Sequence, residues 1–185
     1  MIQLSQFGRL AVSKLWSSVL AALTLVAGAC GGSTALAPVP SVSPGAIQPE
    51  TMTSGGVLRR YTVFRPLSLD PAQPAALVVA IHGYTSSAAE METSTHFDDQ
   101  AAQDKFIVVY PEGINNSWNA GRCCGQNGYD DVAFIGELID RMVSSSHVDA
   151  KRVFVTGLSN GGLMAQRLAC DLSDRVTAVA SVSGG

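Results

Sequence analysis

The chain has 185 residues, 46% of them hydrophobic, a length and composition typical of one globular domain with appendages. Its formal charge is -3, from 12 basic and 15 acidic residues, and neither sign is clustered strongly along the chain. This balance excludes the extended basic surfaces with which proteins bind nucleic acid or anionic membranes.

The first 29 residues have the features of a secretory signal peptide. Arg9 and Lys14 precede an apolar run that starts at Val19, and the run ends in small residues up to Ala29. The run is too short to be a comfortable transmembrane span. We therefore expect residues 1–29 to be a signal peptide and the protein to be exported.

Cys30 follows these small residues directly, and the stretch resembles the lipobox of bacterial lipoproteins, in which the cysteine carries the lipid. Ordinary cleavage after Ala29 suits the sequence almost as well. Uncharged Gly, Ser, Ala and Pro residues then continue to about Gln48 and predict a flexible linker. We assign residues 30–51 to the lipidation site and the linker, and we expect membrane contact only through a lipid on Cys30.

The body of the protein, residues 52–185, alternates strand-like and helix-like segments. Short apolar and β-branched runs predict strands at 59–66, 75–83, 106–113, 151–157 and 176–184. More polar or amphipathic stretches predict helices at 87–105, 130–146 and 160–172, the second with Asp130 or Asp131 as its N-cap. This alternation predicts an open α/β sheet of mostly parallel strands, whose ligands bind at the carboxyl ends of the strands.

One turn of this body carries the pattern of a serine nucleophile. Residues 157–161 fit G-x-S-x-G, which places a serine on a sharp turn between a strand and a helix. Gly157 and Gly161 leave room for the strained backbone of Ser159, and the helix N-terminus favours negative charge beside it. An ordinary glycine-rich turn is the alternative, but the strand before it and the helix after it favour Ser159 as a nucleophile.

A second loop, after the strand at 75–83, is placed to complete an oxyanion hole. Hydrolases with this kind of sheet use such a loop to donate a backbone N–H to the developing negative charge. We expect the backbone N–H groups of Tyr84 and Asn160 to be the donors, with His82 and Gly83 supporting the loop. For the His82 imidazole we favour a buried structural role over proton transfer.

Three cysteines remain when Cys30 is assigned to lipid. We expect Cys170 to pair with Cys123 or Cys124, because exported proteins favour disulfides and adjacent cysteines rarely bridge each other. The remaining thiol then has no partner in this sequence. A metal site is the alternative, but no histidine or further cysteine stands at ligand spacing, so we expect no metal.

The sequence offers Ser159 no partner for proton transfer. A catalytic serine needs a histidine, which in α/β-hydrolases follows the nucleophile together with an acid. All histidines of the chain precede the serine, namely His82, His96 and His147. Asp171 and Asp174 follow it at positions that favour capping or solvation. We expect a domain that is truncated after the strand following the nucleophile helix, and a polypeptide that is inactive alone.

Several motifs in order resemble the polyhydroxybutyrate depolymerase and feruloyl esterase family of secreted α/β-hydrolases. They are IHGYTSS, VVYPEGINNSWNAGRCCG, YDDVAFIGELID and RVFVTGLSNGGLMAQRLAC, and the resemblance covers about residues 57–185. It implies an α/β-hydrolase fold with Ser159 as nucleophile and the His82–Gly83 turn in the oxyanion loop. It also implies hydrolysis of a polyhydroxyalkanoate, or of a feruloyl or acetyl ester on plant polysaccharide, without a cofactor.

Other functions remain open at this point. The same fold serves exported peptidases and acyltransferases, and fold alone does not separate them from esterases. The chain could instead be a catalytically incomplete, lipid-tethered domain that binds a polymer or a partner. It could also be a gene fragment, because an incomplete parallel sheet exposes an unpaired strand edge and apolar faces.

Overall fold

The computed structural model describes residues 45–121, 123, 124 and 128–185. The expected signal peptide at 1–29, the expected lipidation site Cys30 and most of the expected linker lie outside the described residues. Within the described ranges, no helix is long and apolar enough to cross a bilayer.

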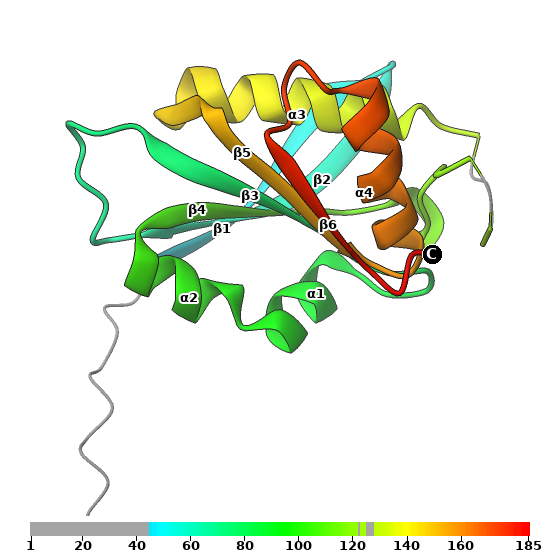
Figure 1. The fold of residues 1–185 in the computed structure, drawn as a ribbon, viewed down its shortest axis with the longest axis horizontal. Coiled ribbons are helices and arrows are strands. Elements are labelled where there is room, and N and C mark those ends of the chain that lie inside the picture. The colour runs from blue at the N-terminus through cyan, green and yellow to red at the C-terminus, as the bar shows by residue number, and fades with distance from the viewer. Residues whose placement is uncertain (1–44, 122, 125–127) are drawn as a thin grey trace, which may run out of the picture. The chain divides into compact units, whose positions relative to one another are not determined.

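The described residues form a six-stranded sheet in the order β1-β2-β4-β3-β5-β6 (Figure 1). β1 pairs antiparallel with β2, and β2 pairs antiparallel with β4. The other neighbours, β4 with β3, β3 with β5 and β5 with β6, run parallel. The expected mostly parallel sheet is therefore confirmed. The strands are β1 (Gly45–Ser54), β2 (Val57–Pro66), β3 (Ala75–Ile81), β4 (Phe106–Pro111), β5 (Val148–Leu158) and β6 (Ala178–Val182).

Helices cover both faces of the sheet (Figure 1). On one face lie α1 (Ala88–Thr95) and α2 (Phe97–Asp104), and on the other lie α3 (Asp131–Ser145) and α4 (Asn160–Asp171). Successive strand side chains point to opposite faces, so Leu77 and Val79 join the core with α3 and α4, whereas Ala80 joins the core with α1 and α2. The helices that connect the parallel strands thus form one apolar core on each face of the sheet.

The segment expected to hold a single helix at 87–105 forms two helices. His96 lies between α1 and α2 with φ 52, a left-handed conformation that ends the first helix. Ser87 caps α1, because its side chain accepts a hydrogen bond from Glu90 N. The break turns α2 so that Ala101 and Ala102 pack against the sheet.

The start of the domain differs from the expectation. We expected a flexible linker through residue 51, but β1 begins at Gly45 and pairs along its whole length with β2. A Gly55-Gly56 turn, with positive φ at both residues, connects the two strands as a tight hairpin. Pro49 is tolerated because β1 is the outer strand of this sheet edge.

Candidate active site

Ser159 lies in the turn between β5 and α4, at the carboxyl edge of the sheet. Its backbone has φ 53 and ψ -115, a conformation that non-glycine residues rarely adopt and that costs about 1–3 kcal/mol. Ser159 N donates a hydrogen bond to Val182 O at 2.7 Å, and Ser159 O accepts one from Leu163 N at 2.9 Å. The strained turn is therefore held by β6 on one side and by the first turn of α4 on the other.

Glycines allow this turn to pack directly against neighbouring backbone. A Cβ on Gly161 would lie 2.3 Å from Ile81 O and 2.4 Å from His82 O. A Cβ on Gly157 would lie 2.2 Å from Gly161 O. These distances are far inside van der Waals contact and the opposing atoms are backbone, so neither position accommodates a side chain without moving β3 or α4.

The two expected oxyanion donors border the same space beside Ser159. Asn160 is the first residue of α4, so its backbone N–H has no carbonyl acceptor within the helix. Tyr84 follows Gly83, and a Cβ on Gly83 would lie 3.7 Å from Ser159 Cβ. The loop that carries Tyr84 and the start of α4 therefore meet at the serine, and the positive end of the helix dipole lies there as well.

The His82 side chain is fully buried, and both of its ring nitrogens are engaged. Nδ1 lies 2.7 Å from Gly83 O, and Nε2 accepts a hydrogen bond from Gly113 N at 3.0 Å. Because Nε2 accepts, the proton belongs on Nδ1 and the ring is neutral. Burial also lowers the pKa of His82, against the opposing effects of Gly83 O and the Glu112 carboxylate. The imidazole thus holds the loop and has no nitrogen left for Ser159.

Trp118 connects the loop after β3 with the start of α4, a role that the sequence motifs did not indicate. Trp118 N donates to Asn160 Oδ1 at 2.8 Å, and Asn160 Nδ2 donates to Trp118 O at 3.1 Å. The indole Nε1 donates to His82 O at 2.9 Å. All three residues are fully buried. The partners of Trp118 lie 36 and 42 residues away in the sequence, so a local pattern does not reveal them.

A buried ion pair anchors the loop that contains Trp118. Arg59 Nη2 donates to Asp131 Oδ1 at 2.7 Å, and both side chains are almost fully buried. Asn119 N donates to the other carboxylate oxygen of Asp131 at 2.7 Å, and the Arg59 guanidinium lies 3.9 Å from the centre of the Phe134 ring. Of the two expected N-caps, Asp130 is the one that caps α3, which leaves Asp131 for this pair.

The cysteines follow a different pairing from the expected one. Cys123 is bonded to Cys124, whereas Cys170 is free and exposed near the end of α4. The structure does not form the expected bridge from Cys170 to either of them, and that pairing stays a prediction. Both bridged cysteines have positive φ, at 70 and 55, which brings neighbouring side chains of this loop together. The Ser117 hydroxyl donates to Cys124 O at 2.6 Å and ties the pair to the Trp118 segment.

The described residues offer no general base to the Ser159 hydroxyl. His82 is engaged elsewhere, as described above, and Nδ1 of the exposed His96 lies 3.9 Å from Asp99 Oδ2. His147 is exposed and directly precedes β5, at the end of that strand opposite Ser159. The two acids that follow the serine form surface ion pairs instead, Asp171 with Arg167 and Asp174 with Arg175. In this same part of the chain, His, Cys, Asp and Glu side chains form no cluster that could hold a metal ion.

Comparison with a solved structure identifies the fold. Acetyl xylan esterase from Aspergillus awamori matches 73% of this chain with a TM-score of 0.63 and 24% sequence identity, and the match covers 50% of that protein. The strand order and the helices on both faces of the sheet agree with this likeness. The fold is an α/β-hydrolase fold with a mostly parallel sheet.

Sequence comparison identifies the family. Feruloyl esterase B of Piromyces equi is 31% identical over 126 residues, which are 66% of this chain and 23% of that protein. Poly(3-hydroxyalkanoate) depolymerase C of Paucimonas lemoignei is 33% identical over 118 residues, 60% of this chain and 28% of that protein. The chain thus spans less than a third of either relative. The model of the family "Esterase PHB depolymerase" matches residues 61–185, and the chain belongs to this family of esterases.

Proposed function

We propose that Ser159 is the nucleophile of a carboxylic ester hydrolase. The observation that carries this proposal is the conformation of the turn, with φ 53 and ψ -115 at a serine directly before α4. Such strain persists only where the surroundings impose it, and here Gly157, Gly161 and the hydrogen bond to Val182 O impose it. The strain turns the hydroxyl out of the helix and presents it at the carboxyl edge of the sheet.

The reaction follows from the groups around the serine. Ser159 Oγ attacks the ester carbonyl, its proton passes through a base to the leaving alcohol, and water then hydrolyses the acyl-enzyme, which releases the acid and restores the Ser159 hydroxyl. The described residues do not supply that base. The backbone N–H groups of Tyr84 and Asn160 stabilise the oxyanion, and each such donor typically contributes about 3 kcal/mol to the transition state. His82 fixes the position of Tyr84 through its bonds to Gly83 O and Gly113 N.

The wider setting of the enzyme is part of the same proposal. Substrates are esters, either a polyhydroxybutyrate-type polyester or feruloyl and acetyl esters of polysaccharide, as the names of the relatives suggest. Residues 1–29 support export, and Cys30 supports a lipid anchor at the bacterial cell envelope.

A second candidate function is a non-catalytic domain that binds a polymer. It is favoured by one observation, which is that the imidazole of His82, the histidine beside the oxyanion loop, is bound to Gly83 O and Gly113 N. The two candidates differ in whether Ser159 reacts with an ester at all.

Rescue with imidazole tests the proposal, because free imidazole can act as the base that the described residues do not offer. We expect imidazole to accelerate release of nitrophenol from nitrophenyl acetate by the full chain more than by Ser159→Ala. The difference between the two proteins removes the contribution of imidazole acting alone. A nitroanilide peptide serves as the control for peptidase activity and is expected to remain intact. Equal rates for the full chain and Ser159→Ala would exclude Ser159 as the nucleophile and favour the binding domain.

A further inference from the structure

The Asn160 side chain is bonded to a distant loop and not to its own helix. Asparagine favours helix N-termini because its side-chain oxygen can accept a backbone N–H there. Within the described residues, the side chain of Ser159, the N-cap of α4, makes no capping hydrogen bond. The fully buried Asn160 amide, one position later, bonds to both the backbone N–H and the C=O of Trp118. The start of α4 is therefore fastened to Trp118.

The Trp118 side chain makes a second link, from the same residue to the loop that follows β3 and carries Tyr84, the oxyanion loop. Its indole Nε1 donates to His82 O at 2.9 Å, and the centroids of the indole and imidazole rings lie 5.1 Å apart. The residues of both links are fully buried, so the links form away from bulk water. The oxyanion loop and the start of α4 are thus joined through Trp118 by two links in series.

The direction of the Tyr84 N–H follows from the carbonyl of the same peptide group. Gly83 O accepts hydrogen bonds from His82 Nδ1 at 2.7 Å and from Ser86 N at 3.2 Å. A trans peptide group is planar and its N–H points opposite to its C=O, so the bonds that hold Gly83 O also direct the Tyr84 N–H. The direction of this N–H relative to α4 therefore depends on where His82 is held, and Trp118 holds it.

The spacing of the two proposed donors decides how well they stabilise an oxyanion. Each N–H nitrogen has to lie about 2.7–3.1 Å from the oxygen that becomes negative in the transition state. Asn160 N belongs to α4, whereas Tyr84 N belongs to the oxyanion loop. A small shift of the loop against the helix lengthens one of the two hydrogen bonds. The links through Trp118 therefore act on the transition state.

We propose that the Trp118 indole and the Asn160 amide are positioning groups, which together fix the distance between the two oxyanion donors. This inference rests on the proposed ester hydrolysis and adds to it the side chains that set the geometry of its transition state. Because the links are in series, breaking either one releases the oxyanion loop from α4, and breaking both costs little more. Side chains that acted independently would have additive effects instead.

Replacing the carbonyl oxygen of the substrate by sulfur tests the inference. Nitrophenyl acetate and its thiono analogue differ in the atom that receives the negative charge, and sulfur accepts hydrogen bonds weakly. Rates are measured on the full chain with imidazole, after subtraction of the rate of Ser159→Ala. Trp118→Phe and Asn160→Ala keep both backbone donors. We expect each variant to lower the oxygen-ester rate about tenfold or more, and the sulfur-ester rate less than about twofold.

The double variant and a control separate positioning from stability. Trp118→Phe combined with Asn160→Ala should react within about twofold of the slower single variant. Tyr110→Phe is the control, because it removes the hydrogen bond from the buried Tyr110 hydroxyl to Asp98 Oδ1 at 2.7 Å, in the core beside α2. It should retain the wild-type ratio of oxygen-ester to sulfur-ester rates. A loss of stability alone lowers both rates together.

Amide hydrogen exchange measured by NMR tests the connection without ester cleavage. Ser86 N is bonded to Gly83 O, so exchange of this amide reports how firmly the oxyanion loop is held. Asn160→Ala changes no group of that loop, yet it should accelerate exchange of the Ser86 amide about threefold or more, as Trp118→Phe should. Tyr110→Phe should leave this exchange rate unchanged.

The outcomes separate the positioning role from the catalytic proposal. Unchanged exchange of the Ser86 amide in Asn160→Ala overturns the inference, whether or not the chain cleaves esters. So do equal falls in the rates of both esters, and losses that add in the double variant. Accelerated exchange without Ser159-dependent cleavage contradicts only the proposed hydrolysis. Cleavage with a wild-type ratio of rates in Trp118→Phe and Asn160→Ala contradicts only the positioning role.

Discussion

At Ser159, the strained backbone and the glycines around it depend on each other. The positive φ of the serine requires α4 to begin close to the end of β3, and Gly161 makes this approach because it has no Cβ. The atoms that would oppose a side chain there are carbonyl oxygens of Ile81 and His82, which cannot rotate away. The backbone geometry of Ser159 therefore depends on Gly161, two residues further along the chain.

Gly161→Ala is expected to destabilise the protein by about 2 kcal/mol or more, because the new Cβ forces backbone apart. Gly136→Ala is the matched control. Gly136 lies inside α3, and its Cβ would make an ordinary contact of 3.4 Å with Leu172 Cδ2 at the end of α4. Alanine stabilises a helix by up to about 1 kcal/mol over glycine. Urea denaturation of both variants measures the difference. Equal stability of Gly161→Ala and Gly136→Ala would contradict the close approach of Gly161 to the backbone of Ile81 and His82.

The buried His82 gives the stability of the protein a defined dependence on pH. In the unfolded chain its pKa is near 6.5, and burial lowers the pKa in the folded protein. Between these two values the unfolded chain binds more protons, so the free energy of unfolding falls as the pH drops below about 6.5. The slope from this one group is at most about 1.4 kcal/mol per pH unit.

His82→Gln is expected to flatten this dependence, since glutamine does not titrate. Denaturation of wild type and variant between about pH 7.5 and about pH 5.5 should show their difference in stability shrinking as the pH falls. His96→Gln, which removes an exposed histidine, should retain the slope of the wild type. A slope that survives in His82→Gln would show that other groups cause it.

At the scale of elements, the segment between β4 and α3 joins strands and helices that are distant in sequence. Trp118 connects the end of β3 with the start of α4, and the Arg59–Asp131 pair connects β2 with the start of α3. Arg167 Nη1 adds a hydrogen bond from α4 to Asn119 O at 2.6 Å. The oxyanion loop and the nucleophile turn are thus positioned by one shared segment.

Asp131→Ala is expected to cost about 3–5 kcal/mol of stability, because it leaves the Arg59 guanidinium buried without its counter-charge. Asp140→Ala, which removes a similar ion pair with Arg175 on the surface, is the control and should change the stability little. Thermal and urea denaturation measure both. Equal, small effects of the two variants would contradict the anchoring role of Asp131.

Sequence patterns predicted most elements because the order of apolar and polar residues in a segment indicates which of its side chains are buried. The apolar runs at β3, β4 and β5 and the amphipathic pattern of α3 are local signals. β1 was missed because its sequence, with Pro49 and several exposed polar residues, resembles a linker, and it becomes a strand only by pairing with β2. The helix expected at 87–105 is present as two helices, because His96 ends the first one with a left-handed φ that leaves no clear signal in the sequence.

The same distinction applies to the site. A local motif indicated Ser159, Gly157 and Gly161, because a nucleophile turn is built from neighbouring residues. Motifs could not indicate the Trp118–Asn160 and Arg59–Asp131 contacts, since their partners are 42 and 72 residues apart. The structure pairs Cys123 with Cys124, which sequence reasoning discounted because adjacent cysteines rarely bridge each other.

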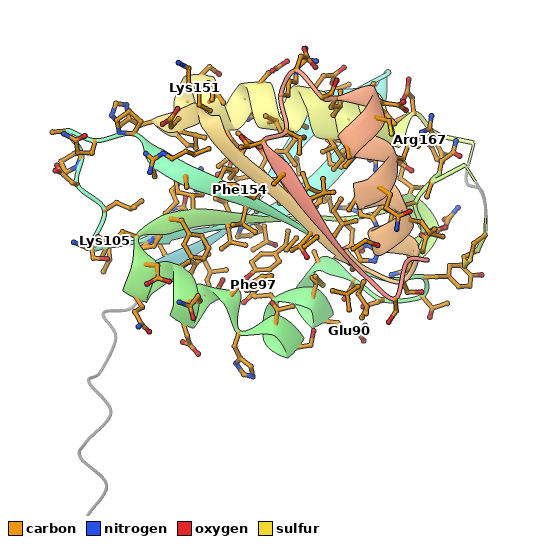
Figure 2. The ribbon with its side chains drawn as sticks, viewed as in Figure 1. Glu90, Phe97, Lys105, Lys151, Phe154 and Arg167 are labelled. Carbon is orange, nitrogen blue, oxygen red and sulfur yellow. A yellow bond between two sulfur atoms is a disulfide. The ribbon has the colours of Figure 1, made fainter. Side chains whose placement is uncertain are left out.

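At the scale of the whole sheet, the nucleophile turn depends on an outer strand. β6 has a strand neighbour on one side only within the described residues, and most of its residues are exposed. Yet Val182 O of this strand accepts the hydrogen bond from Ser159 N. An apolar cavity of about 300 Å³ lies beside β6, where Phe97 of α2 and Phe154 of β5 line the same side of the sheet (Figure 2). Because Val182 belongs to β6, the position of Ser159 depends on the pairing of β6 with β5.

The most direct test of the account is to find where an acyl group is attached. The full chain is treated with nitrophenyl acetate and imidazole, quenched in acid, digested with trypsin and examined by mass spectrometry. We expect one acetyl group on Ser159 in the peptide that follows Arg152 and ends at Arg167, and none on that peptide in Ser159→Ala. Acetylation that is absent from this peptide, or that persists in Ser159→Ala, would contradict the account of Ser159 as an ester-cleaving nucleophile.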